Sequence, residues 1–141
     1  MLKDVSNRAD IEEIVAQFYD LALKDPIIGF IFTDIAKIEL EHHLPVIVNF
    51  WCDSMFKENN YTGNPLAKHL EISDKMPLRA GHFTRWLYLF NKVIDERFAG
   101  VLAENMKQRA EMIAKSISAA ITDQKRSEMN LTLPKATEIK L

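Results

Sequence analysis

The chain of 141 residues is long enough for one domain with its own core, and a content of 48% hydrophobic and 27% charged residues is typical of a globular protein. A net charge of −2 argues against binding to nucleic acid or to an anionic membrane, and no apolar run approaches the roughly 18–20 residues that cross a bilayer. The N-terminus lacks the apolar stretch of a signal peptide, and the single cysteine, Cys52, excludes an internal disulfide, so we expect a cytoplasmic protein.

Few glycines and prolines occur, and they stand between long segments, which favours helices over many short strands. Residues 8–24 carry apolar side chains at the i, i+3, i+4, i+7 spacing of an amphipathic helix, with Asn7 or Ser6 as its N-cap. A short apolar segment, 26–32, follows.

A second long helix is predicted at about 36–57, and Pro45 interrupts it. Because proline lacks a backbone N–H and clashes with the preceding turn, this helix either begins near residue 43 or bends there. Residues 59–64 have the composition of a loop, and Pro65 then opens a short helical turn that reaches residue 72.

A third long helix is predicted between Pro77 and Gly100, and a last one at about 101–121. Residues 123–141 lose the apolar stripe, so we predict a globular domain over 1–122 and a mobile C-terminal tail. No segment shows the period-2 alternation of a strand, so the predicted fold class is all-α.

Two adjacent histidines precede Pro45, and only one of them can face the core, because neighbouring residues on a helix point about 100° apart. His43 shares its face with Ile47 and Phe50, whereas His42 shares its face with Asn49. We therefore predict that His43 points inward and His42 toward solvent. A histidine at the edge of the core with one satisfied hydrogen bond is the alternative that periodicity leaves open.

Polar aromatic side chains come from several predicted helices, and they suggest a pocket. Tyr19, His43 and Trp86 lie on three long helices, and His69 lies on the short turn after Pro65. No Cys-x-x-Cys or His-x-x-x-His pair marks a zinc site, and no local signature of nucleophilic catalysis is present. Such a set could surround a flat apolar cofactor such as a haem, which needs an axial ligand on one side and a tuned cavity on the other.

Four segments resemble the truncated haemoglobins, most closely their third group. They are FYDLALKDPIIGFIF (18–32), HHLPVIVNFW (42–51), YTGNPLAKH (61–69) and HFTRWLYLF (82–90). The chain lacks the Gly-Gly pairs that usually separate helices in the first two groups. The resemblance covers about residues 8–121 and implies a shortened globin fold, with helices sandwiched two over two around haem b.

The resemblance also assigns roles to individual residues. It makes His69 the proximal ligand of the haem iron, and it makes Tyr19, His43 and Trp86 the distal residues that stabilise a ligand. His82 could compete for the proximal role, but it lies one turn from Trp86 on the same helix, which favours His69.

The remaining cofactor contacts are expected from apolar walls and from charge. The family pattern implies that Phe32 and Ile47, with Phe50 nearby, pack against the haem. Tyr61, Lys68 and Arg79 are candidates for contacts to the haem propionates because of their charge and neighbourhood.

The resemblance implies a monomeric bacterial protein that binds O₂, CO or NO at a five-coordinate haem iron. Two distal donors would hold O₂ tightly, which suits redox chemistry on O₂, NO or peroxide, such as NO dioxygenase-like or peroxidase-like activity with an unidentified reductase. A helical interaction module, or a haem-based ligand sensor without catalysis, is the alternative function.

Overall fold

The structure is a computed structural model that describes residues 1–132, with side chains as far as residue 128. Every regular element in this range is helical, which confirms the all-α prediction. The elements in chain order are α1 (Arg8–Ala22), the short π-helix η1 (Ile31–Ile35), α2 (Leu40–Phe56), α3 (Pro65–Lys75), α4 (Ala80–Arg97) and α5 (Val101–Thr132). Within the described residues, no helix combines the length and the apolar character that crossing a membrane requires.

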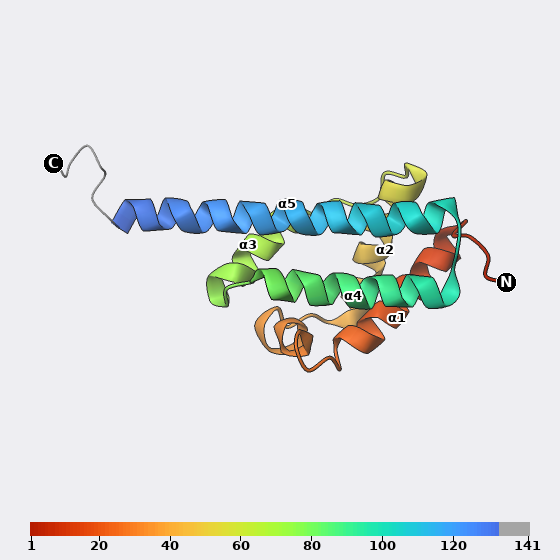
Figure 1. Cartoon of the computed structure of the whole chain (residues 1–141), viewed down its shortest axis with the longest axis horizontal. Helices are drawn as coiled ribbons and strands as arrows, with labels where there is room; N and C mark the ends of the chain where they lie inside the picture. The colour runs from red at the N-terminus through yellow and green to blue at the C-terminus, as the bar shows by residue number, and fades with distance from the viewer. Residues whose placement is uncertain (133–141) are drawn as a thin grey trace.

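The long helices form two packed pairs. Helix α1 packs on α2 and α4 packs on α5, while contacts between α1 and α4 join the pairs (Figure 1). Aromatic rings fill the centre: Phe90 of α4 stacks on Trp51 of α2 with ring centroids 5.2 Å apart. This is the two-over-two arrangement that the resemblance implied.

Two helix starts follow the predicted capping chemistry. The side chain of Asn7 accepts a hydrogen bond from the backbone N–H of Asp10 over 3.0 Å, which caps α1. The side chain of Asn64 accepts one from the backbone N–H of Ala67 over 3.1 Å, and Pro65 occupies the first position of α3. Proline suits that position because the first N–H groups of a helix have no partner within it.

Helix α2 begins at Leu40, so Pro45 lies inside it and both histidines lie on its first turns. The backbone N–H of His43 already donates to the carbonyl of Glu39 over 2.8 Å. The alternative of a helix that starts near residue 43 is therefore wrong, as is the predicted start at 36. Pro45 removes one backbone hydrogen bond from α2 but does not end it.

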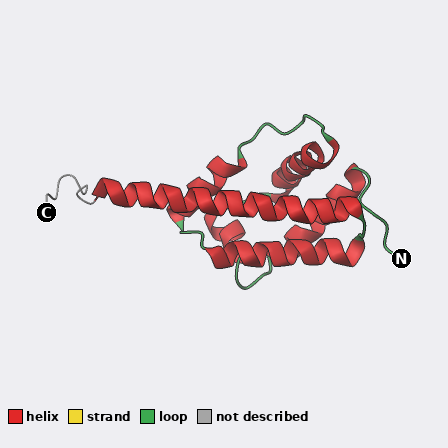
Figure 2. Cartoon of the chain, turned by 45° about the horizontal axis from the view of Figure 1, so that its top comes forward, coloured by secondary structure: helices red, strands yellow, loops and turns green. Residues whose placement is uncertain are grey.

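Helix α5 is longer than the sequence indicated. It continues to Thr132, eleven residues beyond the predicted end at 121. Residues 122–132 contain no glycine or proline, so the helix propagates although its apolar stripe has ended. This end projects beyond the other helices (Figures 1 and 2). The apolar stripe of α5 therefore marks where this helix packs on other helices, and it does not mark where the helix ends. The mobility predicted for residues 123–141 stays a prediction, and residues 133–141 of that tail lie outside the described residues.

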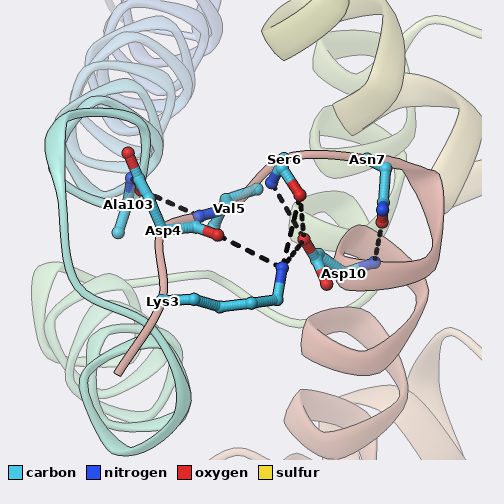
Figure 3. Close-up of polar contacts among 7 residues, drawn as sticks. All are labelled: Lys3, Asp4, Val5, Ser6, Asn7, Asp10 and Ala103. Atoms are coloured by element: carbon cyan, nitrogen blue, oxygen red, sulfur yellow. Dashed lines mark hydrogen bonds and ion pairs between the residues drawn. The ribbon is translucent and has the colours of Figure 1, made fainter. Parts of the chain in front are cut away.

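The N-terminal segment ties the start of α5 to the start of α1 (Figure 3). The Asp4 carboxylate accepts hydrogen bonds from the backbone N–H groups of Leu102 and Ala103 over 3.0 and 2.8 Å. Burial alone would raise the pKa of Asp4, but these N–H donors outweigh it and lower the pKa. The preceding Gly100 has a φ of 144°, and a Cβ there would collide with the Asp4 side chain. Asp4 thus caps α5 from a distant part of the chain.

Asp4→Ala should lower the free energy of unfolding by about 1–2 kcal/mol, the usual effect of losing an N-cap. Urea unfolding followed by circular dichroism measures the change. Asp20→Ala is the matched control, because the exposed Asp20 pairs with Lys24 just past the end of α1 and should change stability by less than about 0.5 kcal/mol. Equal stability of the two variants would contradict the capping role.

Candidate functional site

Tyr19 of α1 and His43 of α2 face each other across the interface of these helices. The Tyr19 hydroxyl lies 2.7 Å from Nε2 of His43, and the ring centroids are 5.1 Å apart. His43 is half-buried, whereas His42 is exposed and lies 3.6 Å from Glu39 between its Nε2 and the carboxylate. The prediction that His43 points inward and His42 outward is confirmed.

In the hydrogen bond between Tyr19 and His43, either residue can be the donor. Burial lowers the pKa of His43, and the nearby imidazole of His69 lowers it further, so the His43 ring is neutral at neutral pH. A neutral ring with a proton on Nε2 donates to the Tyr19 oxygen and leaves the Tyr19 O–H available to another acceptor. With the proton on Nδ1, Nε2 accepts from Tyr19 instead. The tautomer of His43 therefore decides what Tyr19 can donate to.

Trp86 and Phe32 complete the surroundings of Tyr19. The ring of Trp86 stacks on Phe90 with centroids 5.1 Å apart and meets the edge of Phe18 at 5.5 Å, and Phe18 in turn meets Tyr19 at 5.2 Å. The ring of Phe32 meets Tyr19 edge-on at 5.5 Å. We call Tyr19, Phe32, His43 and Trp86 the distal cluster. The structure thus places Phe32 and His43 in contact with Tyr19 and links Trp86 to it through Phe18.

His69 on α3 is held by one defined hydrogen bond. Its Nδ1 lies 2.6 Å from the backbone carbonyl oxygen of Pro65. A carbonyl can only accept, so Nδ1 carries the proton, and a neutral ring then has its lone pair on Nε2. A metal-binding histidine typically donates its other ring N–H to a backbone carbonyl in this way, which orients the ligating nitrogen toward the metal.

His82 has the opposite arrangement. Its Nδ1 accepts a hydrogen bond from the backbone N–H of Arg79 over 2.9 Å at the start of α4. Nδ1 therefore carries the lone pair and a neutral ring has its proton on Nε2, so neither nitrogen is available to a metal without breaking the cap. His82 acts as a helix cap, which favours His69 as the ligand.

Helix α3 has an apolar side that the protein leaves largely uncovered. None of its residues is buried, and its main packing partner is α5. Ile47 and Phe50 of α2 are also only half-buried. An open groove of about 370 Å³ lies between α2, α3 and α5, with Phe50, Leu66 and Ile113 in its lining and His69 outside it. A flat apolar group between α2 and α3 would cover the exposed side of α3, and His69 could ligate a metal at its centre.

Of the three residues predicted to contact the haem propionates, none belongs to the distal cluster. Tyr61 is half-buried and meets Phe50 edge-on, with ring centroids 5.3 Å apart. Lys68 is exposed on α3 beside His69, and Arg79 is exposed at the start of α4. Their exposure suits contacts to carboxylates at the edge of a bound group.

No protein-family model matches the chain. The group 3 truncated hemoglobin Ctb of Campylobacter jejuni is 32% identical to it over 111 residues, which span 77% of this chain and 85% of the relative. The chain belongs to the group III truncated haemoglobin family. A crystal structure of the group III truncated hemoglobin from Campylobacter jejuni matches with a TM-score of 0.77 and 28% identity, covering 86% of this chain and 95% of that one. The shortened globin fold is thereby confirmed.

One buried polar pair of this truncated haemoglobin, Asp25 with Arg85, was not predicted from the sequence. Asp25 is buried, and one of its carboxylate oxygens accepts from Nε and Nη2 of Arg85 over 2.9 and 2.6 Å. Its other oxygen accepts from the backbone N–H groups of Ile27 and Ile28. The hydrogen bond from Arg85 lowers the pKa of Asp25. Because Arg85 precedes Trp86, this pair holds α4 against the segment that leads to Phe32.

His43 should make stability depend on pH. Because its pKa in the folded chain lies below the ordinary value, the unfolded chain binds a proton first as the pH falls through about 6.5, and the folded state loses stability there. We expect His43→Gln to flatten the dependence of the unfolding free energy on pH between about 7.5 and 5.5. Urea unfolding at several pH values measures it.

His42→Gln is the control for this experiment, since His42 is exposed and should leave the wild-type slope unchanged. If both variants kept the wild-type slope, the buried, neutral state of His43 would be contradicted.

Proposed function

We propose that this truncated haemoglobin binds haem b between α2 and α3, with His69 as the proximal ligand, and that it binds O₂ and other diatomic ligands. The observation that carries the proposal is the bond from His69 Nδ1 to the Pro65 carbonyl, which leaves the Nε2 lone pair for iron. The half-buried apolar residues of α2 and the uncovered side of α3 supply the walls. Phe32, Ile47 and Phe50 are the proposed contacts to the ring, and Tyr61, Lys68 and Arg79 those to the propionates.

An iron(II) haem with one histidine ligand supplies an open coordination position for O₂, CO or NO. The distal residues then act on the ligand. Burial raises the pKa of Tyr19, so its hydroxyl stays protonated and can donate, and Trp86 has an indole N–H. Each hydrogen bond to a polar ligand contributes about 1–3 kcal/mol in a dry pocket.

Two such donors imply slow release of O₂, because each 1.4 kcal/mol is about a factor of ten in affinity. Slow release suits a protein that reacts with its ligand more than one that delivers it. We therefore propose redox chemistry on O₂, NO or peroxide in a cytoplasmic monomer, with electrons from a reductase. His43 governs this chemistry through Tyr19, since its tautomer decides whether the Tyr19 proton points to the histidine or to the ligand.

His69→Gly should abolish stoichiometric haem binding, or make it depend on added imidazole, because the variant has no proximal nitrogen. Titration of the haem-free protein with haem, followed by the Soret band, measures the loss. His82→Gly is the matched control and should keep the wild-type ferrous spectrum, since His82 only caps α4. If His82→Gly lost its haem while His69→Gly kept wild-type haem binding, the assignment of His69 would be refuted. A wild-type chain that takes up no haem would refute the function.

Tyr19→Phe and Trp86→Phe should each speed O₂ dissociation by about tenfold or more, from the loss of one donor worth at least 1.4 kcal/mol. Stopped-flow displacement of O₂ measures the rates, and Tyr88→Phe, at an exposed tyrosine of α4, is the control. The effects should not add in the Tyr19/Trp86 double variant, because both donors serve one acceptor.

His43→Leu should change the O₂ dissociation rate less, because it removes one donor but also leaves the Tyr19 hydroxyl without its partner and so available to the ligand. A fast rate in His43→Leu alone would mean that one distal histidine holds the ligand, as in a conventional globin, and the ranking of donors would be wrong.

A further inference from the structure

The placement of α3 depends on the loop that joins it to α2. The closely packed helix pairs of the described residues are α1–α2, α4–α5, α1–α4 and α3–α5. Helix α3 therefore has little direct support from α2, although haem binding requires the two helices to face each other at a fixed separation. The connecting residues 57–64 must supply that support.

Asp53, near the end of α2, holds this loop. Its two carboxylate oxygens accept from the backbone N–H of Asn60 over 3.0 and 3.1 Å, and one of them accepts from the backbone N–H of Tyr61 over 2.8 Å. Hydrogen bonds to a charged acceptor are about twice as strong as those between neutral groups. The loop is thus fastened to α2 at the residues that lead directly into α3.

Ring packing and hydrogen bonds also hold the chain between this attachment and His69. The ring of Tyr61 packs on Phe50 of α2, and a Cβ on Gly63 would collide with the Tyr61 hydroxyl, so the chain folds closely over the ring. Asn64 then caps α3, and the carbonyl of Pro65 receives the proton of His69 Nδ1. Three residues, Thr62, Gly63 and Asn64, separate the attached Tyr61 from Pro65 at the start of α3.

We propose that Asp53 is a positioning residue for the proximal ligand: by fastening Asn60 and Tyr61 to α2, it sets where α3 begins and hence where Nε2 of His69 points. The inference rests on the proposed haem binding at His69. Asp53 is not itself one of the proposed haem contacts, and the hydrogen bonds of its half-buried side chain go to the backbone of the loop. Its role is confined to the geometry of α3.

Asp53→Ala in the haem-loaded, full-length protein tests the proposal. We expect the iron–histidine stretching band in the resonance Raman spectrum of the ferrous protein to shift or broaden, because His69 is no longer held in one orientation. We also expect haem to transfer to an excess of a haem-scavenging apoprotein about tenfold faster. Asp53→Asn keeps one carbonyl acceptor and should recover part of both effects.

Asp4→Ala is the control for general destabilisation. It also removes a carboxylate that accepts backbone N–H groups, but at the start of α5 and not beside α3. It should leave the band position unchanged. A wild-type band and haem transfer rate in Asp53→Ala, or an equal band shift in Asp4→Ala, would overturn the proposal.

Two further measurements keep the test decisive. If Asp53→Ala does not fold, Gly63→Ala, which displaces the Tyr61 ring, should shift or broaden the band, and Asp53→Asn should do so to a smaller extent. An unchanged band in both would refute the proposal. Amide hydrogen exchange of α3 should be faster in the Asp53 variants than in Asp4→Ala, with or without haem. A wild-type chain without the iron–histidine band would refute haem binding, and the exchange rates would still decide whether Asp53 fixes α3.

Discussion

The hydrogen bond from His69 Nδ1 to the Pro65 carbonyl is the contact on which the account of the site depends. It assigns the proton to one ring nitrogen and the lone pair to the other, and it fixes the ring relative to the start of α3. That start is in turn fixed by the Asn64 cap and by the proline at the first helical position. A short helix with no buried residue can therefore present a ligand in a defined direction.

The distal cluster is held differently from His69, because its side chains pack against residues of the core. Phe18, Trp51 and Phe90 are buried, and their rings pack in contact with Trp86 or with one another. Tyr19 is 6% exposed and has its hydroxyl paired with His43, so this polar group is already satisfied in the described structure. With the His43 proton on Nδ1, a ligand that accepts from Tyr19 would compete with His43 for the Tyr19 proton. With the proton on Nε2, His43 donates to the Tyr19 oxygen and the Tyr19 O–H is available to a ligand.

Several features of the fold and the site could be predicted because they depend on residues close together in the sequence. The inward turn of His43 followed from helical periodicity, and the starts of α1 and α3 followed from Asn7 and Pro65, because these signals act within one or two turns. The end of α5 was missed because an apolar stripe reports packing, and a projecting helix needs none. The roles of Asp4, Asp25 and Asp53 were missed for another reason. Each carboxylate meets groups that only the fold brings near, such as Arg85 beside Asp25, 60 residues away.

A crystal structure of the haem-loaded ferrous protein would show which residue binds the iron. We expect one haem between α2 and α3, with iron bonded to Nε2 of His69, Nδ1 of that ring still donating to Pro65, and Tyr19 and Trp86 on the other side of the haem plane. Iron bonded to His82, or to His43 and His69 together, would contradict this expectation.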